Sequence, residues 1–162
     1  PGMNATGYVE MIPYLRHKQN LTIITCCLST AIQISEQLNN CTLICTGGRY
    51  HAPCASLVGA SAETMLKSWF ADIMFFSVNS IDAQNGLTDQ GEEVAHMKSA
   101  MLCQARQAVL LADSSKFGKT SIFRLAHAPI GRIITNRDPL FDEDCWQAYR
   151  EKMIFTEDEQ DK

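Results

Sequence analysis

Five polar or conformationally free residues lie within six positions of this chain: Asp113, Ser114, Ser115, Lys116 and Gly118. An ammonium group meets a phosphate or carboxylate as a point charge, and a carboxylate accepts hydrogen bonds from sugar hydroxyls. The glycine lets the backbone turn close to a ligand. This set suits a small polyhydroxylated anion, while a polar turn that caps the next element is the alternative interpretation.

The position of this turn supports the ligand interpretation. It directly follows the apolar run Ala108–Ala112, which is typical of a strand buried on both faces of a parallel sheet. Open α/β sheets bind their ligands at the carboxyl ends of their strands. We therefore expect Asp113 and Lys116 to contribute to a binding site.

Other predicted strands also end in small or polar residues. Gly47 and Gly48 follow one strand, Ser80 and Asp82 follow another, and Lys98 lies about two turns into the next helix. Loops are polar in most proteins, so this observation alone also fits ordinary surface loops. Because parallel strands share one carboxyl edge, we expect these residues to gather in one crevice.

The elements that would position these side chains alternate between strand and helix. Apolar spacing predicts helices around Ile34 and Leu38, Ala62 and Leu66, and Val94 to Ala105, the last opened by a capping box of Asp89 and Glu92. A shorter helix is expected around Trp146, with a weak strand after it at Met153–Thr156. The five main predicted strands are Leu21–Thr25, Thr42–Thr46, Ile73–Val78, Gln107–Ala112 and Arg132–Thr135.

This alternation predicts an α/β fold with a mostly parallel central sheet that holds the five strands, and helices on both faces. No linker or internal repeat divides residues 1–162, which favours a single domain. The first helical pattern lacks the strand that normally precedes such a helix, and we therefore expect the chain to be a fragment.

Composition restricts the possible partners. The formal net charge of −4 gives no basic surface for nucleic acid, and the apolar runs are too short to cross a bilayer. Seven cysteines, an odd number that includes the adjacent Cys26 and Cys27, suit a reducing compartment. We expect a cytoplasmic domain that has no membrane partner.

Several known catalytic and cofactor-binding motifs do not match this sequence when they are compared residue by residue. Gly118, Lys119 and Thr120 resemble the end of a phosphate-binding P-loop, but position 113 is Asp where that motif needs glycine. A G-x-G-x-x-G fingerprint and metal-ligand spacing are both absent from the sequence, so we expect no cofactor and no metal. Cys27 or Cys54 would need a histidine partner to act as a nucleophile, and we expect both to be buried and inert.

Taken in order, these segments resemble the C-terminal sensor domain of DeoR-type bacterial transcriptional regulators. The resemblance runs through residues 20–25, 41–48, 56–59, 71–73, 80–82, 85–88, 98–101 and 109–118 and covers nearly the whole chain. It implies a three-layer α/β/α fold like that of ribose-5-phosphate isomerase, glucosamine-6-phosphate deaminase and CoA transferases. It also implies an effector site for a phosphorylated sugar or related anionic metabolite. DNA would be bound only through a missing N-terminal helix-turn-helix domain.

The resemblance also implies which residues of this chain would bind the ligand. The family's D-S-G-T-T turn, whose amides and hydroxyls hold phosphate, falls near residues 3–6 and keeps only Thr6, and its T-N-S segment becomes Thr25, Cys26 and Cys27. Ser80 stands where glycine is common in the family. The implied ligand-binding residues are Thr6, Gly47, Gly48, Ser80, Asp82, Lys98, Asp113 and Lys116.

A ligand sensor without catalytic residues is thus the leading functional hypothesis, and we expect it to form a homo-oligomer. A sugar-phosphate isomerase or deaminase on the same fold is the alternative, with Asp82, Glu92 or Glu93 as a base beside Lys98. A purely structural oligomerisation domain is a third interpretation, but it explains the polar strand ends least well.

Overall fold

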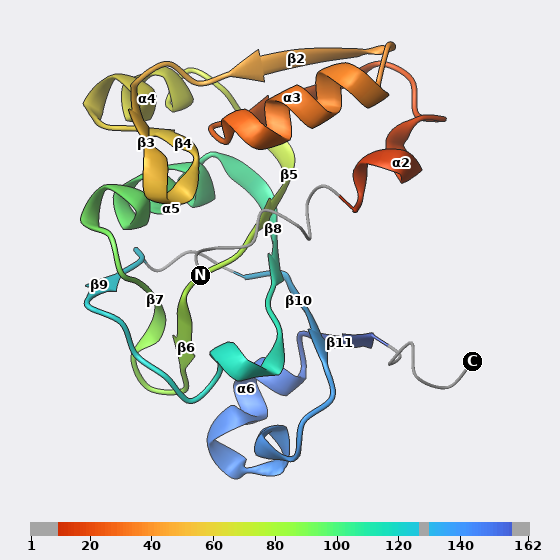
Figure 1. The fold of residues 1–162 in the computed structure, drawn as a ribbon. Coiled ribbons are helices and arrows are strands. Elements are labelled where there is room, and N and C mark those ends of the chain that lie inside the picture. Colours follow the sequence, from red (N-terminus) through yellow and green to blue (C-terminus); the bar gives the residue numbers. More distant parts are fainter. Residues whose placement is uncertain (1–9, 127–129, 157–162) are drawn as a thin grey trace. The chain divides into compact units, whose positions relative to one another are not determined.

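The computed structural model describes residues 10–126 and 130–156, which fall into two compact units (Figure 1). The first unit ends at Trp69 and the second begins at Phe70. Among the described residues, every helix is too short or too polar to span a bilayer.

The first unit contains a parallel strand pair and a short antiparallel hairpin. Strands β1 and β2 pair in parallel from Leu21 opposite Cys41 to Thr25 opposite Cys45. Strands β3 and β4 are antiparallel. In chain order the elements are α2 (Ile12–Leu15), β1 (Leu21–Thr25), α3 (Leu28–Gln37), β2 (Cys41–Cys45), β3 (Arg49–His51), the 3-10 turn η1 (Ala52–Cys54), β4 (Ser56–Val58) and α4 (Ala60–Leu66).

A small apolar cluster holds helix α3 in this unit. Ile34 and Leu38, one helical turn apart, are buried together with Ile12 of α2. Ile23 of β1 and Leu43 of β2 pack against them. The i, i+4 spacing that predicted this helix from the sequence is therefore the face that it buries.

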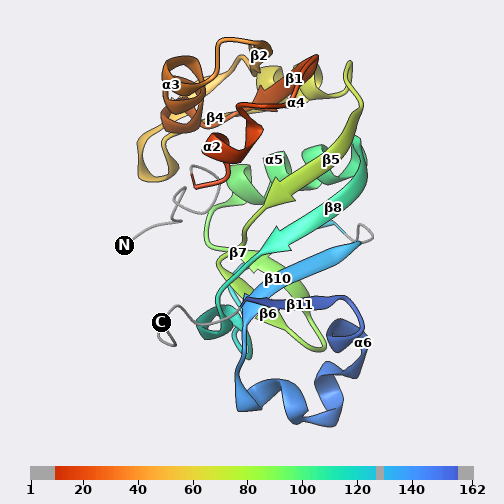
Figure 2. The same cartoon turned by 90° about the vertical axis from the view of Figure 1, so that its right-hand side faces the viewer.

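The second unit contains a four-stranded parallel sheet and a smaller antiparallel sheet. Figure 2 shows the strands of the larger sheet side by side, in the order β11-β10-β8-β5. The smaller sheet has the order β6-β7-β9. The strands are β5 (Ala71–Phe76), β6 (Ser80–Asp82), β7 (Gly86–Asp89), β8 (Ala105–Leu111), β9 (Phe123–Arg124), β10 (Arg132–Asn136) and β11 (Met153–Thr156).

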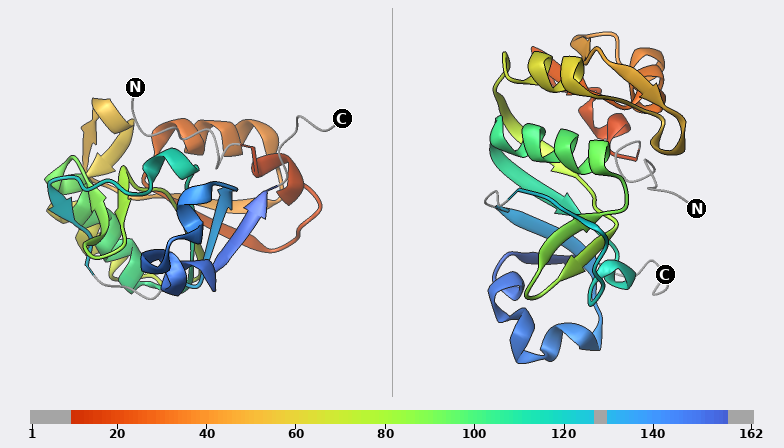
Figure 3. Two further views of the ribbon diagram at one scale, coloured as in Figure 1. Left: turned by 90° about the horizontal axis from the view of Figure 1, so that it is seen from below. Right: turned by 90° about the vertical axis from the view of Figure 1, so that its left-hand side faces the viewer.

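The helical segments of the second unit supply much of its core. Helix α5 covers Glu92–Cys103 and runs along strands β5 and β8 (Figure 3), with Ala95 and Leu102 in the core. Phe76 and Leu110 pack from the sheet. The remaining helical segments are η2 (Ser114–Lys116), η3 (Pro139–Asp142), η4 (Asp144–Trp146) and α6 (Gln147–Arg150).

The α/β class and the mostly parallel sheet predicted from the sequence are confirmed. All five main strands exist, with ends shifted by at most two residues, and the weak strand Met153–Thr156 is present as β11. Among the described residues, β1 and β2 pair with each other in the first unit, and the other three main strands belong to the parallel sheet of the second unit. The expectation of one sheet with all five strands stays a prediction. The hairpin β3-β4 and the β6-β7-β9 sheet were not predicted.

The expectation of a capping box at the start of α5 was wrong. Gly91 occupies the N-cap position and no side chain caps the helix there. Asp89 is the last residue of β7 and is fully buried, where it binds Lys98. Ala105, expected on the helix, is instead the first residue of β8.

Gly48 occupies a position where only glycine fits. Its φ is +123°, and an added Cβ would lie 2.7 Å from the Val58 carbonyl oxygen and 2.9 Å from the Ala62 Cβ. We expect Gly48→Ala to lower the free energy of unfolding by about 1–3 kcal/mol, measured by urea denaturation, because it combines backbone strain with a clash against backbone.

Gly47 provides the matched control for this prediction. A Cβ at Gly47 would meet nothing within 4 Å, and its φ is not positive. Gly47→Ala should therefore change stability by less than about 0.5 kcal/mol, as a surface substitution does. Equal losses in the two variants would contradict the assignment of a special role to Gly48.

Candidate effector site

The turn predicted to bind a ligand lies directly after β8, as expected. Asp113 caps the 3-10 turn Ser114–Lys116, and its Oδ1 accepts hydrogen bonds from the backbone N–H and the hydroxyl of Ser115. The Asp113 side chain thus fixes the shape of the turn, which presents the hydroxyls and the Lys116 ammonium at this edge.

Lys116 connects the carboxyl ends of two neighbouring strands. Its Nζ donates to the Val78 carbonyl oxygen at 2.9 Å and to the Ser77 Oγ at 3.4 Å, both just after β5. The side chain is partly buried, and no carboxylate of the described residues lies within ion-pair distance of it. A cation with no neutralising partner at a strand edge can attract an anion.

Asn136 adds the carboxyl end of β10 to the same edge. Its Oδ1 accepts from the Ser114 backbone N–H at 2.8 Å, and its Nδ2 donates to the Ser114 Oγ at 2.9 Å. Ser77 and Asn136 were not among the candidates from the sequence. Asn136 directly follows the predicted strand Arg132–Thr135, so the strand-end rule that selected Asp113 would have found it. Ser77 was missed because the predicted strand Ile73–Val78 extends past the observed end of β5 at Phe76.

Asp82 lies beside this edge and closes the turn between β6 and β7. Its Oδ1 accepts from the backbone N–H groups of Asn85 at 2.7 Å and Gln84 at 3.0 Å. The Asn85 hydrogen bond is the main reason that the pKa of Asp82 lies below its usual value, so the group is ionised at neutral pH. A β-bridge between Ile81 and Phe117 joins β6 to the turn that contains Lys116.

Ser80 and Lys98 are more buried than an open crevice would require. Ser80 is 7% exposed and its Oγ lies 2.8 Å from the Ser121 Oγ. Lys98 is 9% exposed and its Nζ lies 2.7 Å from Asp89 Oδ2. Their assignment to the ligand site stays a prediction.

The three remaining candidates lie in other parts of the chain. Gly47 donates its N–H to the Met65 sulfur at 3.3 Å, and Gly48 packs against Val58, both within the first unit. Thr6 lies outside the described residues. The expectation that these three residues share a crevice with Lys116 therefore stays a prediction.

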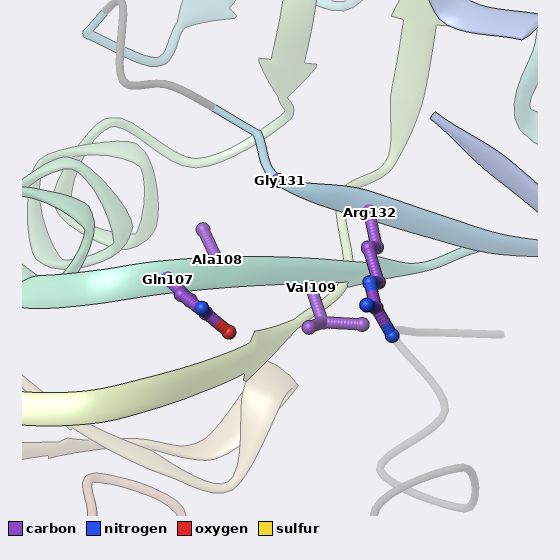
Figure 4. Close-up of a pocket in the computed structure, with 5 residues that line it drawn as sticks. All are labelled: Gln107, Ala108, Val109, Gly131 and Arg132. Carbon is purple, nitrogen blue, oxygen red and sulfur yellow. The ribbon is translucent and has the colours of Figure 1, made fainter. Parts of the chain in front are cut away.

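A small cavity of about 160 Å³ lies away from these strand ends. Its lining comes from the middle of β8 and the start of β10 (Figure 4): Gln107, Ala108, Val109, Gly131 and Arg132. Arg132 is its one charged residue, and it is exposed. In the parts of the chain that the structure describes, no three His, Cys, Asp or Glu side chains are grouped to hold a metal ion.

Comparison with known proteins shows the family to which this chain belongs. The family model of the DeoR C-terminal sensor domain matches residues 4–137. The chain is therefore a member of the DeoR C-terminal sensor domain family, which is regulatory rather than catalytic.

Curated relatives include regulators from bacteria and an archaeon. The HTH-type transcriptional regulator IolR of Bacillus subtilis is 33% identical over 86% of this chain and 55% of its own length. The L-fucose operon activator of Haemophilus influenzae is 30% identical over 84% of this chain and 55% of its own. The HTH-type transcriptional regulator GlpR of Haloferax volcanii is 36% identical over 59% and 37%. The chain spans about half the length, or less, of these relatives.

Proposed function

We propose that this sensor domain binds a phosphorylated sugar or a similar small anionic metabolite at the carboxyl edge of β5, β8 and β10. The partly buried ammonium group of Lys116 carries this proposal. It lies where three strand ends meet, and the part of the chain that is described offers it no carboxylate. A phosphate group bound there would supply the missing negative charge.

The neighbouring groups suit the remainder of such a ligand. The hydroxyls of Ser114 and Ser77 and the amide of Asn136 can donate to or accept from sugar hydroxyls. Asp113 and Asn136 hold the turn in place before a ligand arrives, which lowers the entropy cost of binding. Thr6, Gly47, Gly48, Ser80, Asp82 and Lys98 are proposed as further parts of the site.

We further propose that the chain acts as one sensor domain within a longer regulator. The relatives named above are called transcriptional regulators or an operon activator, and two are named as helix-turn-helix proteins. An effector that binds one conformation or assembly state more tightly than another would shift DNA affinity by that difference. A two-fold operator would favour a homodimer.

The test of the ligand proposal is calorimetric titration of the chain with ribose 5-phosphate, glucose 6-phosphate and fructose 1-phosphate, each beside its unphosphorylated sugar. We expect at least one phosphorylated sugar to bind more tightly than its parent. Lys116→Ala should weaken that binding by about 1.5–3 kcal/mol, because a hydrogen bond to a charged group is lost.

Lys152→Ala is the matched control, since Lys152 is an exposed lysine and the variant has the same change of charge. It should leave the affinity unchanged. Equal losses in the two variants would indicate a general charge effect and not a site. Formation of an isomerised sugar phosphate during the titration would contradict a purely regulatory role.

A further inference from the structure

Cys27 lies at the start of helix α3, where the helix exposes backbone N–H groups. It is the N-cap residue, and its carbonyl accepts the first helical hydrogen bond from the Ala31 N–H at 3.0 Å. Its own N–H donates to the Thr25 Oγ1 at 3.1 Å, which fixes the backbone at the end of β1. Cys27 is partly exposed and is not part of a disulfide.

Two hydroxyl groups of the first helical turn lie beside this sulfur. The Ser29 Oγ is 3.1 Å from the Cys27 Sγ. Thr30 is only 8% exposed, and its Oγ1 is buried with no hydrogen-bond partner among the residues that the structure describes. A buried donor without an acceptor is costly, and a negatively charged or oxygenated sulfur would provide the acceptor.

The same two residues affect the ionisation of the thiol. Partial burial alone would raise the pKa of Cys27, but the thiolate can accept hydrogen bonds from the hydroxyl and backbone N–H groups of Ser29 and Thr30, and these outweigh burial and bring the pKa below the usual value. Strands β1, β2 and β4 contain no charged residue, and Glu36, the one charged residue of α3, lies more than two turns along the helix. Hydrogen bonds and the helix N-terminus, more than ion pairs, therefore favour the thiolate.

We propose that Cys27 is a site of covalent modification that reacts with hydroperoxides, a function beyond effector binding. The thiolate sulfur attacks the terminal oxygen of the hydroperoxide, and an S–O bond forms as the O–O bond breaks. The departing oxygen takes a proton from water and leaves as an alcohol or as water. The sulfur gives up two electrons to the peroxide and becomes a sulfenic acid, whose oxygen can accept a hydrogen bond from Thr30.

The other cysteines provide internal controls, since none of the seven is in a disulfide. Cys145 is exposed, but desolvation and the neighbouring Glu143 carboxylate raise its pKa. Cys54 is partly buried like Cys27, and its sulfur lies 3.1 Å from the His51 Nδ1 instead of beside hydroxyl groups. The expectation that Cys27 is buried and inert is thus replaced by a partly exposed thiol with activating neighbours.

The experiment treats the reduced chain with hydrogen peroxide and traps sulfenic acid with dimedone between pH 6 and 9. Tandem mass spectrometry then measures the labelling rate at each cysteine and separates Cys27 from Cys26. The rate at Cys27 divided by the rate at Cys145 should rise at least about threefold as the pH falls from 8.5 to 6.5. The reason is that the thiol with the lower pKa keeps a larger fraction of thiolate as the pH falls. The rate at Cys27 itself should change little with added salt, because hydrogen bonds and not ion pairs favour its thiolate.

Thr30→Val and Ser29→Ala test the origin of the reactivity. Each should lower the labelling rate of Cys27 at pH 6.5 by at least about threefold while the rate at Cys145 stays the same. Circular dichroism checks that the variants fold, and the pH dependence in the unmodified chain tests the proposal without any variant. A constant Cys27 to Cys145 ratio across pH, or labelling at Cys26 in place of Cys27, would overturn it.

Discussion

Replacing Lys98 with methionine should lower the free energy of unfolding by about 3–5 kcal/mol, because it leaves a buried carboxylate without its cation. Asp89 is fully buried and its Oδ2 lies 2.7 Å from the Lys98 Nζ. Its Oδ1 already lacks a hydrogen-bond partner among the described residues. Urea denaturation followed by circular dichroism measures the loss as a shift of the midpoint.

Two controls separate the ion pair from other effects of the substitution. The double variant Asp89→Asn, Lys98→Met should recover much of the loss, since the charge that is costly to bury is then removed with its partner. Arg106→Met breaks a pair in which both side chains are more than 80% exposed, and it should change stability by less than about 1 kcal/mol. A single Lys98→Met variant as stable as the parent would show that the pair does not stabilise the fold.

Trp146→Ala should cost about 3–5 kcal/mol of stability, because it opens a large cavity in an aromatic cluster. Trp146 is 2% exposed, and its ring lies 5.4 Å from Phe117 and 5.5 Å from Tyr149, both edge to face. Phe117 also packs edge to face on Phe141 at 4.7 Å. Such arrangements contribute beyond the apolar area that they bury.

Trp69→Ala is the matched control for this prediction, because Trp69 is the other of the two tryptophans in the chain and is 37% exposed. Its loss should cost clearly less. Phe117 directly follows Lys116, so Trp146→Ala should also weaken the proposed phosphate binding, whereas Trp69→Ala should not. Equal destabilisation by the two variants in urea denaturation would contradict a central role for the cluster.

The parts of the fold that were predictable are those with local patterns. Strand β1 was predicted with its observed ends, and Ile34 and Leu38 marked the buried face of α3. Strands β6 and β9 have three and two residues, too few for an alternating pattern, and β9 pairs with β7 from 34 residues further along the chain. Pairing over such a distance leaves no local signal in the sequence.

In the candidate site, too, local patterns were predictable from the sequence and contacts between distant residues were not. The Asp113 turn was placed correctly because its apolar strand directly precedes it. Asp89 was misread as a helix cap because the spacing to Glu92 fits a capping box, while its true partner, Lys98, lies nine residues away. Cys27 was expected to be buried because a small apolar strand precedes it, whereas the structure leaves it partly exposed at the start of α3 with the Ser29 Oγ 3.1 Å from its sulfur. Its reactivity stays a proposal.

The strand order of the larger sheet has a consequence for how the chain assembles during synthesis. Neighbouring strands follow one another in the chain, from β5 through β8 and β10 to β11. Each new strand can therefore dock on the free edge left by the previous one as it leaves the ribosome, and none has to insert between two strands that are already paired. The strands β5 and β8, whose carboxyl ends Lys116 joins, are thus the first pair of this sheet that can form.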